Sequence, residues 1–138
     1  MDDHCKPTKV LGFDHLTIIV EDIQKTREFY VGILGMTEVT RPEFDFDGAW
    51  FQTGSVQIHV TLADANSGLA GWGDRRVVKI SRGHHFAFEV ASLEQAFESL
   101  KSDGIKIADG PKVRPDGVKQ LYIRDPDGHL VELFSHSV

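Results

Sequence analysis

Histidines at repeated positions are the first residues of this sequence whose type and spacing could support chemistry. The segment 13–23 (FDHLTIIVEDI) is followed seventy positions later by a similar segment, 83–93 (GHHFAFEVASL). Aligning the two segments places His15 on His85. A repeat of this size predicts a chain built from two similar modules.

A second correspondence, at the end of each module, adds two more polar residues. The segment 56–62 (VQIHVTL) resembles 130–135 (LVELFS), and their alignment places His59 on Glu132. Side chains alternate between the two faces of a strand, so His59 lies opposite its apolar neighbours. A carboxylate such as Glu132 among apolar residues is costly to bury unless it is paired, protonated or bound to a metal.

Together these four residues have the composition of a metal site. Three imidazoles and one carboxylate suit a single divalent ion such as Zn, Ni, Mn or Fe, with positions left for water or substrate oxygens. One strand histidine alone is more often structural, so the prediction depends on all four occurring together. His84 competes with His85 but would point to the opposite face. Three other histidines occupy tail, turn or terminal positions and are expected to be solvated: His4, His129 and His136.

The elements that must position these residues follow the same order in both modules: a strand, a helix and three more strands. Asp22 and Ser92 are typical N-caps, and Gly35 is a typical helix end. We expect strands at 13–20, 38–41, 49–53, 56–62, 85–90, 105–107, 119–124 and 130–134, and helices at 22–34 and 92–102. The segment 63–82 is expected to connect the modules, with 77–80 extended. The residues at 125–128 (DPDG) suit a tight reversal.

These elements predict an α+β fold in which two βαβββ modules form a curved mixed sheet around a metal-binding cleft, with the helices outside. The expected domain spans residues 10–137, with module one at about 10–64 and module two at about 83–137, after a tail at 1–9. Trp50 and Phe51 alternate on one strand, so one should face the cleft and the other the core. Trp72, among glycines, is a candidate lid or subunit contact.

Composition narrows the functional classes. The net charge of −6 argues against nucleic acid as the main partner. No apolar run is long enough for a membrane span. The first ten residues (MDDHCKPTKV) lack the apolar centre of a secretory signal, and Cys5 is the only cysteine, which favours a reducing cytoplasm.

The residues in this order and spacing resemble the vicinal oxygen chelate superfamily, which includes glyoxalase I, extradiol dioxygenases, fosfomycin-resistance proteins and bleomycin-binding proteins. The resemblance covers about residues 10 to 137 and is carried by DHLTIIVEDI, FYVGILGM, GHHFAFEV and YIRDPDGHLVEL. It implies paired βαβββ modules around a metal. It also implies metal ligands at His15, His85 and Glu132, with His59 as a fourth in some branches, and a homodimer.

The resemblance is greatest to small glyoxalase I-like proteins, and it implies a metal-dependent lyase or isomerase. Its substrate would be a small molecule with two neighbouring oxygens, such as a thiol adduct. Glu132 or a metal-bound water would serve as the base. Thr17, Gln57 and Tyr122 are candidates to orient the substrate. Three cations are candidates to hold an anionic substrate group, or are simply solvated: Arg41, Lys112 and Arg114.

Three alternatives remain open at this point. Extradiol dioxygenases use two histidines and one glutamate for Fe(II), which this chain also offers. Fosfomycin-type thiol transferases share the HLT segment at 15–17 and a tyrosine at Tyr122, although this chain lacks their basic C-terminal extension. The third alternative is a small-molecule binding protein that uses the cleft without a metal.

The main hypothesis has one departure from its family. Glyoxalase I has glutamate where this chain has His59, so Glu132 would be the only metal-bound carboxylate.

Overall fold

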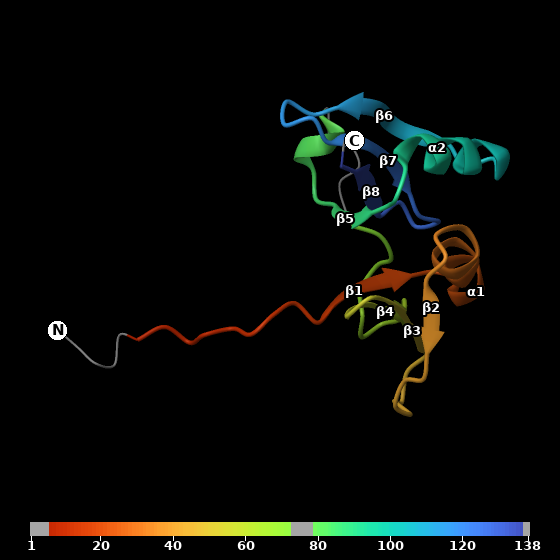
Figure 1. The fold of residues 1–138 in the computed structure, drawn as a ribbon. Coiled ribbons are helices and arrows are strands. Elements are labelled where there is room, and N and C mark those ends of the chain that lie inside the picture. The colour runs from red at the N-terminus through yellow and green to blue at the C-terminus, as the bar shows by residue number, and fades with distance from the viewer. Residues whose placement is uncertain (1–5, 73–78, 137–138) are drawn as a thin grey trace.

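The computed structural model describes residues 6–72 and 79–136, which form two βαβββ modules of similar construction (Figure 1). This confirms the predicted α+β class. Module one contains β1 (His15–Val20), α1 (Ile23–Arg27), a π-helical turn (Glu28–Ile33), β2 (Thr37–Val39), β3 (Gly48–Thr53) and β4 (Val56–Leu62). Module two contains β5 (Phe86–Glu89), α2 (Leu93–Ser102), β6 (Ile107–Val113), β7 (Lys119–Arg124) and β8 (Leu130–Ser135).

The helices begin where the cap residues predict. The Asp22 side chain accepts a hydrogen bond from the Lys25 N–H at 3.0 Å, and the Ser92 side chain accepts one from the Gln95 N–H at 3.2 Å. Each cap satisfies a backbone donor that the first helical turn leaves unpaired. The first helix continues as the π-helical turn and ends at Gly35, whose φ of 74° is a left-handed conformation that favours glycine.

Each module has its own four-stranded sheet, with the order β1-β4-β3-β2 in one and β5-β8-β7-β6 in the other. The first and last strands of a module are parallel neighbours. Their register places Thr17 beside His59 and Ala87 beside Glu132. The two modules therefore repeat the same pairing: the residue two positions after His15 is paired with His59, and the residue two positions after His85 is paired with Glu132.

The apolar faces of both sheets share one hydrophobic core. Ile18, Val20 and Ile58 from module one and Val131 and Leu133 from module two are buried in it. Burying such a side chain stabilises the fold by about 1.5–3 kcal/mol. The prediction for Trp50 and Phe51 is confirmed, because Phe51 is fully buried in this core whereas Trp50 lies on the other face of β3 beside His59.

The segments outside the strands differ in part from the predictions. The strand predicted from residue 13 begins at His15, and residues 6–14 carry no helix or strand and run away from the modules (Figure 1). His4, Cys5 and residues 77–78 of the predicted extended segment lie outside the described residues. Ile80, the last residue of that segment, begins a short 3-10 helix, Ile80–Arg82. No helix in the described part of the chain is long and apolar enough to span a membrane.

Strand β6 is longer than predicted. The sequence indicated a strand at 105–107 and then a loop, but β6 begins only at Ile107, runs to Val113 and pairs with β7 through two register shifts. Gly110 permits this path, because its φ is 89° and a Cβ there would lie 2.9 Å from the Gln120 carbonyl oxygen. The loop prediction was wrong for 108–113, because Pro111 suggested a break that the irregular strand accommodates, whereas the predicted turn around 115–117 is present.

The predicted reversal at 125–128 joins β7 to β8 and also joins the two modules. Asp125 Oδ2 accepts hydrogen bonds at 2.8 Å from the Tyr30 hydroxyl of module one and from Nδ1 of His129. Asp127 Oδ1 accepts another from the Glu21 N–H of module one at 3.1 Å. The prediction that His129 is solvated was wrong: only 1% of this residue is exposed, because its imidazole is needed to satisfy the buried Asp125 carboxylate.

We expect the Tyr30–Asp125 hydrogen bond to contribute to the stability of both modules together. In a double-mutant cycle of Tyr30→Phe and Asp125→Asn, the free energy of unfolding should show a coupling of about 1.5–3 kcal/mol, as for a buried hydrogen bond to a charged group. Urea denaturation of the four proteins measures it. Tyr30→Phe combined with Asp116→Asn, an exposed residue of another turn, is the matched control and should show additive effects. Additive effects in the first cycle would contradict this account of the module junction.

Candidate functional site

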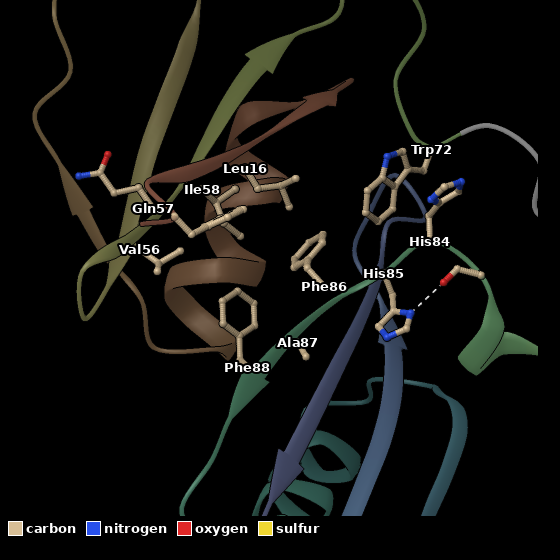
Figure 2. A pocket seen from close by; sticks show the side chains of 12 residues that line it. Leu16, Val56, Gln57, Ile58, Trp72, His84, His85, Phe86, Ala87 and Phe88 are labelled. Atoms are coloured by element: carbon tan, nitrogen blue, oxygen red, sulfur yellow. Dashed lines mark hydrogen bonds between the residues drawn. The ribbon is translucent and has the colours of Figure 1, made fainter. Parts of the chain in front are cut away.

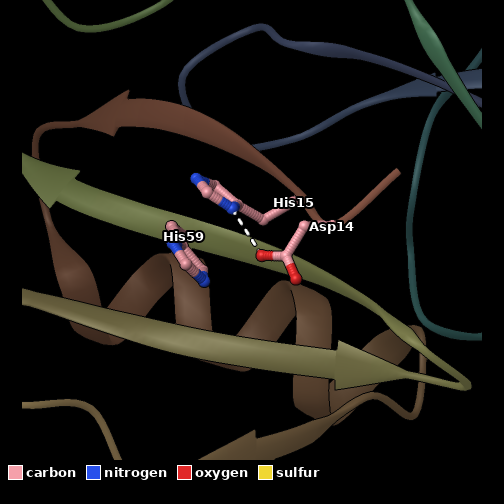
Figure 3. A group of neighbouring side chains, drawn as sticks. All are labelled: Asp14, His15 and His59. Atoms are coloured by element: carbon pink, nitrogen blue, oxygen red, sulfur yellow. Dashed lines mark hydrogen bonds and ion pairs between the residues drawn. The ribbon is translucent and has the colours of Figure 1, made fainter. Parts of the chain in front are cut away.

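Two of the predicted ligands, His15 and His59, lie side by side on the face of β1 and β4 that is opposite α1 (Figure 3). Their ring centroids are 3.8 Å apart and their planes differ by 14°. His59 also stacks on Trp50 of β3, with ring centroids 3.9 Å apart and planes within 2°. The His59 ring is therefore held between two aromatic rings.

Hydrogen bonds orient both imidazoles. His15 Nδ1 donates to Asp14 Oδ2 at 2.8 Å, which leaves Nε2 with its lone pair. The Gln57 amide gives its N–H to Gln52 Oε1 at 2.8 Å, so its own Oε1 accepts from His59 Nε2 at 2.7 Å. Nδ1 of His59 consequently keeps its lone pair. A metal-binding histidine needs such a partner for its second nitrogen.

The electrostatic environment of His59 favours the uncharged imidazole, which is the form that binds a metal. Burial lowers the pKa of His59, and the nearby His15 and Arg41 lower it further, against the opposite influence of Asp14. A pKa below the usual value keeps the ring neutral over a wider pH range. Protons therefore compete less with a metal ion for the nitrogen atom of His59.

The other two predicted ligands, His85 and Glu132, form a second pair in module two. His85 Nδ1 donates to the Gly83 carbonyl oxygen at 2.8 Å (Figure 2), and His85 Nε2 lies 3.2 Å from Glu132 Oε1. Glu132 is 5% exposed on β8, and the Tyr122 hydroxyl donates to its Oε1 at 3.2 Å. Here the acceptor that fixes the tautomer is a backbone carbonyl rather than a side chain, and it leaves Nε2 of His85 directed at Glu132.

Tyr122 remains a hydrogen-bond donor at any physiological pH. Burial raises the pKa of Tyr122 to about 12, and the charge of Glu132 and the hydrogen bond to it act in the same direction. Its proton therefore stays on the hydroxyl oxygen and is directed at Glu132. Tyr122, predicted to orient a substrate, donates its hydroxyl hydrogen to Glu132 in this structure.

The structure does not bring the two pairs together within one chain. In the described residues, the cluster of possible ligand atoms that lie within 4.8 Å of one another consists of Asp14, His15 and His59. Over residues 6–72 and 79–136, no hydrogen bond, ion pair or ring contact links this cluster to His85 or Glu132. Asp14 is the neighbour that the sequence analysis did not single out, although its position directly before His15 makes it a natural partner.

Two cavities flank the pairs. One, of about 660 Å³, is mainly apolar and lies between the modules, where Leu16 and Ile58 face Phe86 and Phe88 (Figure 2). Trp72 lines it and lies with its ring 5.7 Å from that of Phe86, so this residue contributes to the junction of the modules.

The second cavity, of about 510 Å³, contains the polar pair of module two. It is lined by His85, Tyr122 and Glu132 together with Lys112 and Arg114. Two of the cations considered in the sequence analysis are thus placed beside candidate ligands.

The remaining predicted site residues lie around His59. Thr17 is exposed and paired in register with His59 across β1 and β4, so it is open to a substrate. Gln57 is engaged in orienting His59. Arg41 donates from Nη2 to the Phe46 carbonyl oxygen at 3.2 Å, and its guanidinium lies over the rings of Phe44 and Phe46.

Comparison with known proteins agrees with this fold. The model of the Glyoxalase/Bleomycin resistance protein/Dioxygenase superfamily matches residues 12–133. The chain belongs to this superfamily. Among curated proteins it is similar to Glyoxylase I 4 of Arabidopsis thaliana, at 24% identity over 96% of this chain and 75% of that protein. It is also similar to the metallothiol transferase FosB of Shouchella clausii, at 29% identity over 90% of this chain and 80% of that protein.

Solved structures of this superfamily have the same fold. A putative glyoxalase family protein from Bacillus anthracis superposes with a TM-score of 0.73, at 25% identity over 96% of this chain and all of that one. The fosfomycin resistance protein FosX from Listeria monocytogenes superposes with a TM-score of 0.72, at 22% identity over 94% of this chain and 97% of that one. The superfamily is therefore clear, and its relatives include more than one activity.

If both pairs hold the same ion, removing a residue from either pair should weaken metal binding. We expect His59→Ala and His85→Ala each to lower the Zn affinity more than about 100-fold, and Gln57→Leu to lower it about 10- to 100-fold through loss of orientation. Competition with a chromogenic chelator measures these affinities. His84→Ala is the matched control, because His84 is exposed next to His85, and it should bind Zn as the unmodified chain does. Full affinity in His85→Ala would leave the ion to module one alone.

Proposed function

We propose that this chain is a metal-dependent enzyme of the glyoxalase type, and that a homodimer completes each of its metal sites. In this proposal His15 and His59 of one copy meet His85 and Glu132 of a second copy. The observation that carries the proposal is the presence of two preoriented ligand pairs on separate sheets of the same chain. Each pair alone offers two of the four proposed ligands, and a metal ion held by all four can still bind water or substrate oxygens in its remaining positions.

The module junction supports completion by a second copy rather than by closure within the chain. Asp125 binds Tyr30 across the junction, and apolar residues of both modules share one core. Turning one module against the other would expose this core and leave the Asp125 carboxylate with fewer partners. Association of two copies leaves these contacts intact, and closed two-fold dimers are the commonest soluble oligomers.

The donor set fits a divalent metal ion. His15 and His85 keep their Nε2 lone pairs, His59 keeps that of Nδ1, and Glu132 supplies a carboxylate oxygen. A bound ion would stabilise the negative charge that develops on a substrate oxygen during proton transfer. Imidazole and carboxylate ligands suit Zn, Ni, Mn and Fe, so the donor set leaves the choice among them open.

Glu132 is the proposed proton carrier. It accepts a proton from the carbon that bears the substrate hydroxyl and returns the proton to the neighbouring carbonyl carbon, while the hydroxyl proton passes to the former carbonyl oxygen. The substrate keeps its composition, so this isomerisation needs no oxidant or reductant. Tyr122 holds Glu132 Oε1 in place through its hydroxyl, and the exposed Thr17 beside His59 contacts the substrate.

A thiol transferase is the second candidate. The observation that favours it is the histidine at position 59, which makes Glu132 the single carboxylate among the four proposed ligands. A carboxylate pair would suit transfer of a proton between two carbons better than a single carboxylate does. In a thiol transferase a thiolate adds to an electrophilic carbon, and a proton is delivered to the departing oxygen.

Subunit complementation tests the shared site. His59→Ala and Glu132→Gln should each bind almost no Zn as separate proteins. When the two variants are unfolded, mixed in equal amounts and refolded, half of the dimers are mixed and each of these regains one intact site. About a quarter of the full Zn stoichiometry should therefore return, as expected for a two-fold dimer. A mixture that binds no more Zn than the separate variants would rule out a site shared between copies.

Substrate classes tested on the Zn-, Ni-, Mn- and Fe-loaded protein then separate the activities. We expect turnover of a hemithioacetal formed from an α-oxoaldehyde and a thiol, abolished by Glu132→Gln. The matched control, His84→Ala, should retain the activity. Turnover only of an epoxide with a thiol would instead establish the second candidate. Oxygen consumption with a catechol and iron would contradict both and indicate a dioxygenase.

A further inference from the structure

The rings on either side of His59 fix the plane of its imidazole but not the positions of its two nitrogens. The ring centroids of His15 and Trp50 lie 3.8 and 3.9 Å from that of His59. An imidazole that is turned over about its Cβ–Cγ bond has the same flat shape, so stacking does not distinguish the two orientations. The orientation of His59 therefore depends on its hydrogen bonds.

A chain of hydrogen bonds runs from His59 to the turn between β3 and β4. His59 Nε2 is 2.7 Å from Gln57 Oε1. Gln57 lies directly across the two strands from Gln52, and its Nε2 is 2.8 Å from Gln52 Oε1. Gln52 Nε2 in turn is 3.1 Å from the carbonyl oxygen of Gly54. Two side-chain amides thus connect the imidazole to a backbone carbonyl group.

The Gly54 carbonyl group sets the direction of every bond in this chain. A carbonyl oxygen only accepts, so Gln52 directs its NH2 group at Gly54 and its Oε1 at Gln57. Gln57 then donates to that oxygen and presents its own Oε1 to the imidazole. His59 consequently carries its proton on Nε2 and keeps the lone pair of Nδ1. Reversing either amide would leave like groups facing each other, which costs free energy.

The backbone holds the carbonyl group at the end of this chain. Thr53 and Val56 are paired in register, so Gly54 and Ser55 form a two-residue turn between the strands. Gly54 has a φ of 55°, a left-handed conformation that favours glycine. The position of its carbonyl group is therefore set by the turn and not by the side chains that bind to it.

We propose that Gln52 is a positioning residue that determines, through Gln57, which nitrogen of His59 faces the metal ion. This inference rests on the proposed function, in which His59 is a ligand, and it specifies Nδ1 as the ligand atom. The hydrogen bond at one imidazole nitrogen decides whether the other is free to bind a metal. Module two differs, because the Gly83 carbonyl oxygen accepts from Nδ1 of His85 and leaves Nε2.

Two substitutions of Gln52 test the direction of the hydrogen bonds. A glutamate accepts but does not donate, so Gln52→Glu should still accept from Gln57 and keep the proton of His59 on Nε2. A lysine donates but does not accept. Gln52→Lys should therefore attract Gln57 Oε1, turn the amide NH2 group toward His59 Nε2 and move the imidazole proton to Nδ1.

Nitrogen-15 NMR of the metal-free protein, labelled on its histidine rings, measures this tautomer at alkaline pH, where the imidazoles are uncharged. Comparison with His59→Ala assigns the signals. Gln52 is only partly buried beside a turn, so both variants leave the hydrophobic core unchanged.

Zn affinity provides the second measurement. Gln52→Lys should bind Zn about 10- to 100-fold more weakly than the unmodified chain, as expected when the hydrogen bond behind a ligand is lost. Gln52→Glu should not lose affinity. Ser55→Lys is the matched control, because it adds the same positive charge to the same turn outside the hydrogen-bond chain. It should keep the Nε2 proton of His59 and lose less Zn affinity than Gln52→Lys.

The outcomes separate this inference from the proposed function. A proton on Nε2 of His59 in Gln52→Lys as well as in Gln52→Glu would overturn the positioning role. A loss of Zn affinity that is equal in Gln52→Lys and Ser55→Lys would also overturn it. A chain that binds no Zn, although its tautomers change as expected, would overturn the proposed function and leave the orientation of His59 by Gln52 established.

Discussion

The buried carboxylate of Asp125 is the central polar contact between the two modules, beside their shared hydrophobic core. Its oxygens accept hydrogen bonds from the Tyr30 hydroxyl, from His129 Nδ1 and from the backbone N–H groups of Asp127 and His129, at 2.8 to 3.0 Å. A carboxylate is costly to bury unless such partners satisfy it. The turn between β7 and β8 therefore folds against module one, and the relative position of the two modules depends on that contact.

The same contact decides how the candidate ligands are distributed. It joins the modules through the apolar sides of their sheets, so His15 and His59 share one open face and His85 and Glu132 share another. Each pair is already oriented by hydrogen bonds before any metal is bound. On this account each metal site forms at the interface between two copies of the chain. One copy provides His15 and His59, and the other provides His85 and Glu132.

The sequence predicted the repeated parts of the structure and missed the unrepeated ones. The strand periodicity and the caps at Asp22 and Ser92 are local signals, and they located most elements within a few residues. The repeat predicted that His59 and Glu132 occupy corresponding positions, and in the structure the two residues lie beside β1 and β5, the corresponding strands of the two modules. The burial of His129 could not be predicted, because its partner Asp125 is itself buried against Tyr30, a residue 95 positions earlier in the chain.

The contacts that prepare the site for chemistry were also beyond the sequence. The tautomer of His85 depends on the carbonyl group of Gly83, and the hydrogen bonds to Asp116 determine which edge of Arg114 faces Glu132.

The most direct test of the central claim is a crystal structure of the Zn-loaded protein with anomalous data at the Zn edge. The account predicts a peak bound by His15 and His59 of one copy and by His85 and Glu132 of another. A peak bound by Asp14, His15 and His59 of one copy alone would contradict it.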